Sequence, residues 1–362
     1  MPEKKKQQSS LILRESMQQP PNVNPDVLKN IGRKRKKLLS ADEYVSGVIS
    51  GNRSILGQAI TLVESSNPRH SELAQTVIEN CLRYCGNSVR IGITGIPGAG
   101  KSTFIEAFGT MLTGRGRKVA VLAIDPSSVR SGGSILGDKT RMERLSVDPN
   151  AFIRPSPSAG TLGGVARKTR ENIILCEAAG FDTILVETVG VGQSETAVAS
   201  MVDFFMLLMV AGTGDELQGL KRGIMELADL IIVNKADGEN ILKAERTAAE
   251  FRNAIHFFPV PASGFRQVVT TCSSKTGTGI EDIWQTINEY LTFTKKTGYF
   301  YERRKEQDVI RMHDFIAGDL MDSFYSNQNV KVTLKDVEEK VRRGEMTSYK
   351  AAYILLNRFL NK

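Results

Sequence analysis

Short apolar runs alternate with longer amphipathic stretches between about Arg90 and Ser273. The runs read VRIGIT, VAVLAI, DTILVE, FFMLLMVA, LIIVN and VVTTCS. Continuous apolar strands separated by helix-length segments are typical of a parallel sheet covered by helices on both faces. The longest run, around residues 204–212, is about half the length that a membrane-spanning helix requires. The pattern therefore predicts an α/β fold with a mostly parallel sheet and without a membrane span.

The regions before and after this one have helical spacing instead. Between Ala41 and Gly86, one predicted helix face carries Leu73, Val77, Cys81 and Cys85, with Ala74, Ile78 and Leu82 beside them. This spacing favours Cys81 and Cys85 as small core residues over a metal pair. Beyond about Lys295 the chain is helical and charged, and the last helix is expected to gather its apolar residues on one side: Ala351, Ala352, Ile354, Leu355 and Leu356.

The charge of the chain is concentrated at its N-terminus. The net charge is +8 over 362 residues, and residues 1–40 carry ten basic and three acidic residues, which is +7 of that total. We therefore expect a basic, disordered tail over 1–40, a helical segment over 41–88, an α/β domain over 89–295 and a helical arm over 296–362. Nucleic-acid binding is disfavoured, because no aromatic residue interleaves the basic run around residues 32–37. Four cysteines without a regular framework and no secretory signal predict a cytoplasmic protein.

The stretch RIGITGIPGAGKST carries the strongest chemical signal. A predicted strand runs into the pattern G-x-x-x-x-G-K-[ST], whose glycines let backbone N–H groups converge on phosphates while a helix begins behind them. We expect Lys101 to reach the β- and γ-phosphates and the Ser102 hydroxyl to bind Mg²⁺. The predicted phosphate-binding residues are Gly95, Ile96, Pro97, Gly98, Ala99, Gly100, Lys101, Ser102 and Thr103.

A second motif, Asn234-Lys235-Ala236-Asp237, follows the apolar run LIIVN. A carboxylate there can accept hydrogen bonds from N1–H and the 2-amino group of guanine, whereas adenine would present an acceptor to it. Ser273, Ser274 and Lys275 follow a later strand and are expected to form the second base-contacting loop, with a backbone N–H for guanine O6. The two motifs together favour GTP and GDP over adenine nucleotides.

Glu187 ends the run DTILVE, where nucleotide-binding folds of this kind place an acidic residue near Mg²⁺. We expect Gly190 to sense the γ-phosphate through its N–H. The Mg²⁺ shell is predicted from Ser102, Asp125, Asp138 and Glu187, although not all of them can be direct ligands. For Asp138 a helix N-cap is the alternative. Lys101, Glu187 and Asp125 are the catalytic candidates, and slow intrinsic hydrolysis accelerated by a partner is expected, because Gln193 is not at the water-orienting position.

Several segments together resemble the MeaB/ArgK-type GTPases: GIPGAGKST, AIDPSS, GGSILGDKTRM, DTILVETVGVGQSE, GTGDELQGLKRGIMELADL and NKADG. The resemblance extends from about Ala41 to the C-terminus. It implies a P-loop fold with helical extensions, a homodimer formed through the arm over 296–362, and a third switch segment over 212–222 in which Gln218 and Lys221 couple to the partner. The family accompanies methylmalonyl-CoA mutase, and some members were formerly called lysine/arginine/ornithine transport ATPases.

The resemblance implies a GTP-hydrolysing metallochaperone. It would gate adenosylcobalamin loading, and the protection or reactivation, of methylmalonyl-CoA mutase or a related B12-dependent acyl-CoA mutase. Cobalamin itself is expected on the mutase, since the three histidines of this chain are widely separated. The alternative is a phosphotransferase that passes the γ-phosphate of GTP or ATP to a small metabolite or transport component. The sequence does not distinguish among candidate mutases.

Overall fold

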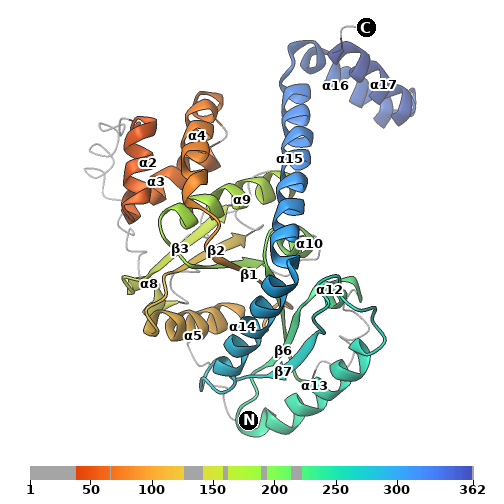
Figure 1. The fold of residues 1–362 in the computed structure, drawn as a ribbon. Helices are drawn as coiled ribbons and strands as arrows, with labels where there is room; N and C mark the ends of the chain where they lie inside the picture. The colour runs from red at the N-terminus through yellow and green to blue at the C-terminus, as the bar shows by residue number, and fades with distance from the viewer. Residues whose placement is uncertain are drawn as a thin grey trace, which may run out of the picture. The chain divides into compact units, whose positions relative to one another are not determined.

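The structure, a computed structural model, describes residues 38–65, 67–125, 142–157, 162–188, 194–212 and 222–360. All helices and strands of the described residues lie in one compact unit, Ala41–Lys362 (Figure 1). The strands are β1 Val89–Gly95, β2 Val119–Asp125, β3 Ala151–Pro157, β4 Thr183–Thr188, β5 Phe204–Val210, β6 Leu230–Asn234 and β7 Val268–Thr271. The helices of the central region are α5 Lys101–Gly114, α8 Glu143–Val147, α9 Leu162–Ala178, α10 Ser194–Ala199, α12 Arg222–Leu227, α13 Ile241–Ile255 and α14 Ile280–Thr297, with a 3₁₀ turn η2 Gly238–Asn240.

The seven strands form one sheet in the order β3-β2-β4-β1-β5-β6-β7, and every neighbouring pair is parallel. This confirms the predicted parallel α/β fold. Because the strands are parallel, their carboxyl ends meet at one edge of the sheet, where ligands bind in folds of this type. The loops that follow β1, β4 and β6 carry the phosphate motif, Glu187 and the base motif, so the predicted site residues are drawn to that edge.

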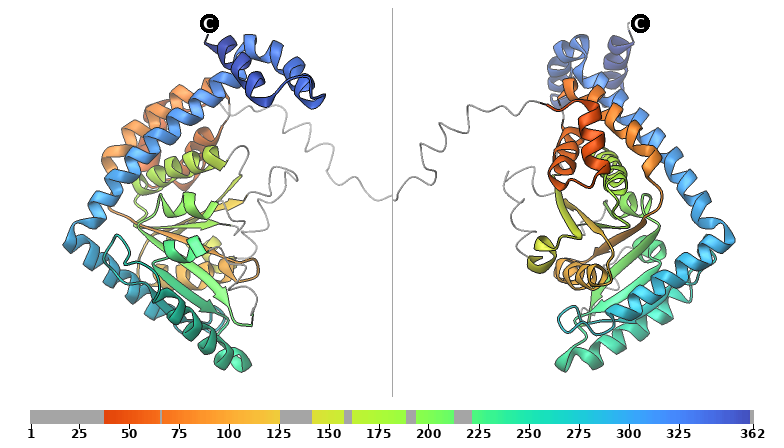
Figure 2. Two further views of the ribbon diagram at one scale, coloured as in Figure 1. Left: turned by 90° about the vertical axis from the view of Figure 1, so that its right-hand side faces the viewer. Right: turned by 60° about the vertical axis from the view of Figure 1, so that its left-hand side comes forward.

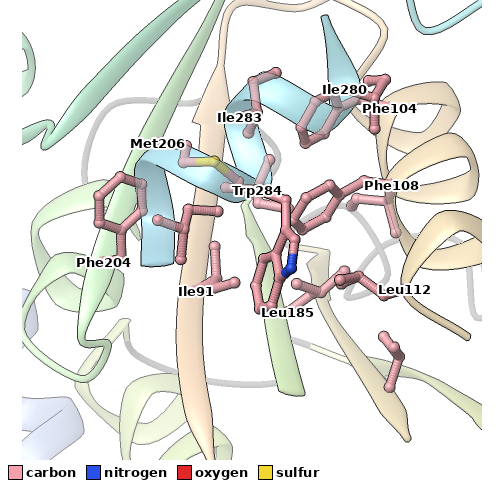
Figure 3. Close-up of a cluster of buried hydrophobic side chains, with 14 of the residues drawn as sticks. Ile91, Phe104, Phe108, Leu112, Leu185, Phe204, Met206, Ile280, Ile283 and Trp284 are labelled. Atoms are coloured by element: carbon pink, nitrogen blue, oxygen red, sulfur yellow. The ribbon is translucent and has the colours of Figure 1, made fainter. Parts of the chain in front are cut away.

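Helices α5 and α14 cover one face of the sheet, and α9 and α10 contact strands on the other (Figures 1 and 2). Figure 3 shows the core on the α5 side, where Phe104 and Phe108 of α5 and Trp284 of α14 pack on Ile91 and Met206 of the sheet. Phe108 meets Trp284 edge-on, with ring centroids 6.1 Å apart. A helix that starts inside the phosphate motif is thus fixed to the sheet by fully buried aromatic residues, which preorganises the loop in front of it.

Helical extensions flank this region, as predicted. The N-terminal helices are α2 Ala41–Ile49, α3 Arg53–Glu64 and α4 Pro68–Cys81, followed by the 3₁₀ turn η1 Leu82–Tyr84. The C-terminal arm consists of α15 Tyr299–Ser326, α16 Gln328–Arg342 and α17 Ser348–Phe359. Among the described residues, no helix combines the length and the apolar character needed to cross a bilayer.

Three local predictions were wrong. The strand β3 was missed, because Arg154 and two prolines interrupt its apolar pattern; prolines are tolerated there because β3 is the edge strand. Helix α4 ends at Cys81, so Leu82 is exposed and Cys85 lies beyond the helix, where its thiol donates to the carbonyl oxygen of Ile174. In α17 only Ala351 and Leu355 of the predicted apolar side are buried, because the neighbouring helix α16 and Phe324 of α15 cover only part of that side.

Candidate nucleotide-binding site

The phosphate motif forms the turn between β1 and α5. Gly95 and Gly100 have positive φ angles of 151° and 86°, a region that residues with a Cβ rarely adopt. A Cβ at Gly95 would lie 2.2 Å from the carbonyl oxygen of Leu208, and one at Gly100 would lie 2.9 Å from Nδ2 of Asn234. Both glycines are therefore required by close approach to neighbouring strands and loops. Helix α5 begins at Lys101 without a side-chain cap, which leaves its first N–H groups for a ligand.

Lys101 is buried inside the turn. Its Nζ donates to the carbonyl oxygens of Gly95, at 2.7 Å, and of Ile96, at 3.2 Å. Burial lowers the pKa of Lys101, and the negative charges of Glu187 and Glu195 oppose that shift. The remaining residues of the loop differ in exposure: Ala99 is buried, Ile96, Gly100 and Ser102 are half-buried, and Pro97, Gly98 and Thr103 are exposed.

Ser102 and Glu187 come from different elements and face each other. The hydroxyl of Ser102 donates to Oε1 of Glu187 at 3.3 Å. The sheet register explains the meeting, because Glu187 of β4 lies opposite Ile93 of β1, two residues before the motif begins. A hydroxyl and a buried carboxylate at the mouth of a phosphate loop are oxygen donors of the kind that Mg²⁺ prefers, so these two residues fit the predicted metal.

Other predicted residues are only partly tested. The backbone of Asp125 ends β2 at the same sheet edge, since Ala123 of β2 lies opposite Glu187, but its side chain is outside what the structure describes. Asp138, Gly190, Gln218 and Lys221 also lie outside the described residues.

Asn234 joins the base motif to the phosphate loop. Its Nδ2 donates to the carbonyl oxygen of Ala99 at 2.8 Å, and its Oδ1 accepts the backbone N–H and the hydroxyl of Ser274, at 3.1 and 2.8 Å. The side chain is almost fully buried. One residue therefore holds three loops in fixed relation. The Ser274 N–H, a candidate donor to guanine O6, is bound to Asn234 in this structure.

Asp237 is positioned by the second base loop. The Ser273 hydroxyl donates to Oδ2 of Asp237 at 2.6 Å and accepts the N–H of Thr276 at 3.1 Å. Lys235 has a φ of 62°, which is unusual for a residue other than glycine, and this conformation turns the chain between the two polar residues of the motif. The side chains of Lys235 and Lys275 are exposed. The geometry leaves the Asp237 carboxylate half-buried at the edge of the site.

Two features were missed from the sequence. Glu195, in the first turn of α10, is only 2% exposed and lies close enough to Lys101 for its charge to raise the pKa of that lysine. An acid in a first helical turn is common, so nothing in the sequence indicates that this one is buried. In addition, the buried hydroxyl of Thr188 donates to that of Thr94 at 2.7 Å, which ties the ends of β4 and β1 together behind the loop.

The parallel sheet, the phosphate turn and the base loops define a P-loop nucleotide-binding protein of the GTPase class. Residues 56–329 match the family described as methylmalonyl Co-A mutase-associated GTPase MeaB, and the chain belongs to that family. It is 50% identical over 317 residues to a probable GTPase of Mycobacterium bovis, covering 88% of this chain and 94% of the relative.

Two further similarities extend the comparison. The chain is 44% identical over 341 residues to the mitochondrial methylmalonic aciduria type A homolog of Mus musculus, covering 91% of this chain and 82% of that protein. The crystal structure of an LAO/AO transport system kinase superposes with a TM-score of 0.70 at 36% identity, covering 90% of this chain and all of that one.

Proposed function

We propose that this chain binds GTP with Mg²⁺, hydrolyses it to GDP and phosphate, and uses the cycle to gate adenosylcobalamin loading and protection of a B12-dependent acyl-CoA mutase. Methylmalonyl-CoA mutase is the favoured partner, because the family is described by its association with that enzyme. The structural support is the Asn234–Ala99 hydrogen bond, which joins a guanine-type base loop directly to a phosphate loop.

In the proposed site, Lys101 binds the β- and γ-phosphates with the Nζ that now donates to Gly95 and Ile96. Ser102 and Glu187 would hold Mg²⁺, with Asp125 and Asp138 as further candidates. When bound, the metal supplies charge neutralisation at the β- and γ-phosphate oxygens. Asp237 would accept hydrogen bonds from guanine. Gly190 is proposed to sense the γ-phosphate through its N–H, and loss of that phosphate would release the segments around it.

Partner coupling is proposed for Gln218 and Lys221, which precede α12 in the chain. Lys221→Ala should leave GTP affinity near that of the unsubstituted chain but remove stimulation of hydrolysis by the mutase. Lys305→Ala, on the exposed side of α15, is the matched control. Equal stimulation of Lys221→Ala and the unsubstituted chain would contradict this assignment.

We also propose a homodimer formed through the C-terminal arm. On α15, Val309, Met312, Ile316 and Leu320 recur at intervals of three or four residues, and each is about half exposed. This spacing places them on one helix face, and a row of exposed apolar side chains is typical of a surface that is covered in an assembly. The cytoplasmic location stays a prediction; all four cysteines are free thiols, which agrees with it.

The test of the proposed function is a binding and product experiment on the full chain. Calorimetry with GTP, GDP and ATP in MgCl₂ should show uptake of both guanine nucleotides and much weaker uptake of ATP. With γ-labelled GTP and purified mutase, free phosphate should be the sole labelled product. Equal affinity for ATP would contradict the guanine assignment. A labelled small metabolite formed from GTP would instead support the phosphotransferase alternative.

A further inference from the structure

Helix α10 lies in the chain between a residue near the carboxyl end of β1, where the nucleotide site is, and a residue near its amino end. Glu187, before the helix, lies opposite Ile93 near the carboxyl end of β1, whereas Asp203, after it, bonds through its N–H to the carbonyl oxygen of Arg90 near the amino end, at 2.8 Å. Glu187 and Asp203 therefore lie near opposite ends of β1, and α10 lies between them in the chain.

Helix α10 packs closely against β1. A Cβ at Gly92 of β1 would lie 2.6 Å from the ring of Phe205 and 3.0 Å from the side chains of Val198 and Val202. Both valines are fully buried. The helix thus sits directly against the strand that leads into the phosphate loop, and a densely packed contact of this kind shifts as a body.

The C-terminal end of α10 is tied to α9 and α15 by buried polar side chains. Arg170 of α9, which is 6% exposed, donates through Nη2 to the Ser200 hydroxyl at 2.7 Å and forms an ion pair through Nη1 with Asp314 of α15. From α15, Arg303 donates to the carbonyl oxygen of Ala199 at 3.0 Å, and Gln307 donates to that of Val202 at 2.8 Å. We call Arg170, Ser200, Arg303, Gln307 and Asp314 the α10–α15 joint.

The joint contains polar atoms whose bonding is incomplete. Within the described part of the chain, Nε of Arg170 and Oε1 of Gln307 are buried without a hydrogen-bond partner. Such groups are costly in a folded protein. By contrast, the base of α15 is firmly held nearby, because Arg304 donates to both carboxylate oxygens of Asp203, at 2.8 and 2.7 Å. The incomplete bonding is thus located where α10 meets α15, and a different position of α10 could satisfy it.

At its other end, α10 carries the buried Glu195, whose negative charge acts on Lys101. A triphosphate that attracts Lys101 changes the charge facing Glu195, and the helix that bears this glutamate is the one fixed at the joint. We propose that Arg170 is a positioning residue of the nucleotide site: by linking α10 to α15, it makes the choice between GTP and GDP depend on the state of the C-terminal arm. The coupling is reciprocal, so whatever the arm contacts also biases the nucleotide.

This inference rests on the proposed binding of GTP, and its test separates the two. Affinities of the full chain for a non-hydrolysable GTP analogue and for GDP are measured by calorimetry in MgCl₂. In Arg170→Gln and Asp314→Asn the ratio of the two affinities should change about fivefold or more, in the same direction. Arg170→Lys keeps the charge facing Asp314, so its affinity ratio should lie between that of Arg170→Gln and that of the unsubstituted chain. Lys305→Gln, which removes an exposed ion pair on α15, is the matched control.

Hydrogen exchange over residues 299–314 supplies a readout that a purely structural role would not change. In the unsubstituted chain it should differ between the analogue and GDP, and in Asp314→Asn the difference should disappear. Should Arg170→Gln fail to fold, the half-exposed Asp314 still provides the test through Asp314→Asn. Affinity ratios within twofold of the unsubstituted chain, with nucleotide still bound, overturn the coupling alone. If the unsubstituted chain binds neither nucleotide, the proposed function fails first and the coupling with it.

Discussion

Individual residues in this protein acquire their roles from partners that are distant in sequence. Asn234 bonds to Ala99, which is 135 residues earlier, and Ser102 bonds to Glu187, which is 85 residues later. The residue types and their motifs could be predicted because each motif is contiguous. The burial of Glu195 and the threonine pair Thr94–Thr188 could not be predicted, because they depend on which strands are neighbours in the sheet.

Replacing the base-contacting acid should exchange one purine for another. In Asp237→Asn the side chain keeps an oxygen that can accept N1–H and gains an amide donor, which suits the 2-carbonyl of xanthine and opposes the 2-amino group of guanine. We expect GTP affinity to fall about 100-fold and affinity for XTP to exceed that for GTP. Competition binding with both nucleotides checks this. A parallel loss for both purines would mean that Asp237 only stabilises the loop through Ser273.

The second residue-scale prediction concerns Gly100. In Gly100→Ala a Cβ 2.9 Å from Nδ2 of Asn234, at a φ of 86°, should push the base loop away from the phosphate loop. We expect nucleotide affinity to fall roughly tenfold or more. Gly114→Ala is the control on the same helix, because a Cβ there meets no atom within 4 Å. If both variants bind GTP equally well, the close approach has no functional weight.

At the scale of elements, strands and helices followed the apolar pattern where both faces of a strand are buried. The prediction failed for β3, where the sheet ends, and at the end of α4, where the chain leaves the helix at Cys81. Neither failure is random: an edge strand and a helix terminus are where neighbours from elsewhere in the chain decide burial. The joint between α10 and α15 has no sequence signature for the same reason.

Asp229 links the starts of β5 and β6 and should make stability depend on pH. Its Oδ2 accepts the N–H of Phe205 at 2.8 Å, and burial raises its pKa from 3.8 to about 6, with Arg303 opposing. A carboxyl with a higher pKa in the folded state binds its proton more tightly when folded, so the free energy of unfolding decreases as pH rises between those values.

We therefore expect Asp229→Asn, which keeps an acceptor for Phe205, to raise the free energy of unfolding over that of the unsubstituted chain by more at pH 7.5 than at pH 4. The difference should be up to about 2–3 kcal/mol. Denaturant unfolding at both pH values measures it. Asp182→Asn is the control, since Asp182 also accepts a backbone N–H before a strand, that of Lys118, but on a more exposed site. A pH-independent effect of Asp229→Asn would contradict the prediction.

For the whole molecule, the sequence pattern indicated both helical extensions, and the resemblance supplied the assembly. The exposed apolar row on α15 is the observation that supports the proposed homodimer. The sequence pattern of this region indicates only a helical, charged segment, so it does not predict the row. If this row is the interface, the α10–α15 joint places the subunit contact in communication with the nucleotide.

Charged residues on that row should separate the subunits. We expect the double variant Met312→Glu with Ile316→Glu to shift the mass measured by light scattering from dimer to monomer. The melting temperature of each subunit should change little, because both side chains are about half exposed. Leu242→Glu, an exposed leucine on α13, is the matched control. A dimer that persists would locate the interface elsewhere, and a monomeric unsubstituted chain would refute the homodimer.

The two edge strands of the sheet have a consequence for how this protein self-associates at high concentration. Pro155 and Pro157 lie in β3 and lack N–H groups, yet β3 still pairs with β2, so the missing donors face outward. The opposite margin, β7, is only four residues long. A strand from another molecule can therefore form few backbone hydrogen bonds with either edge strand. We expect the chain to resist fibrillar polymerisation at high concentration, so that self-association is left to its helices.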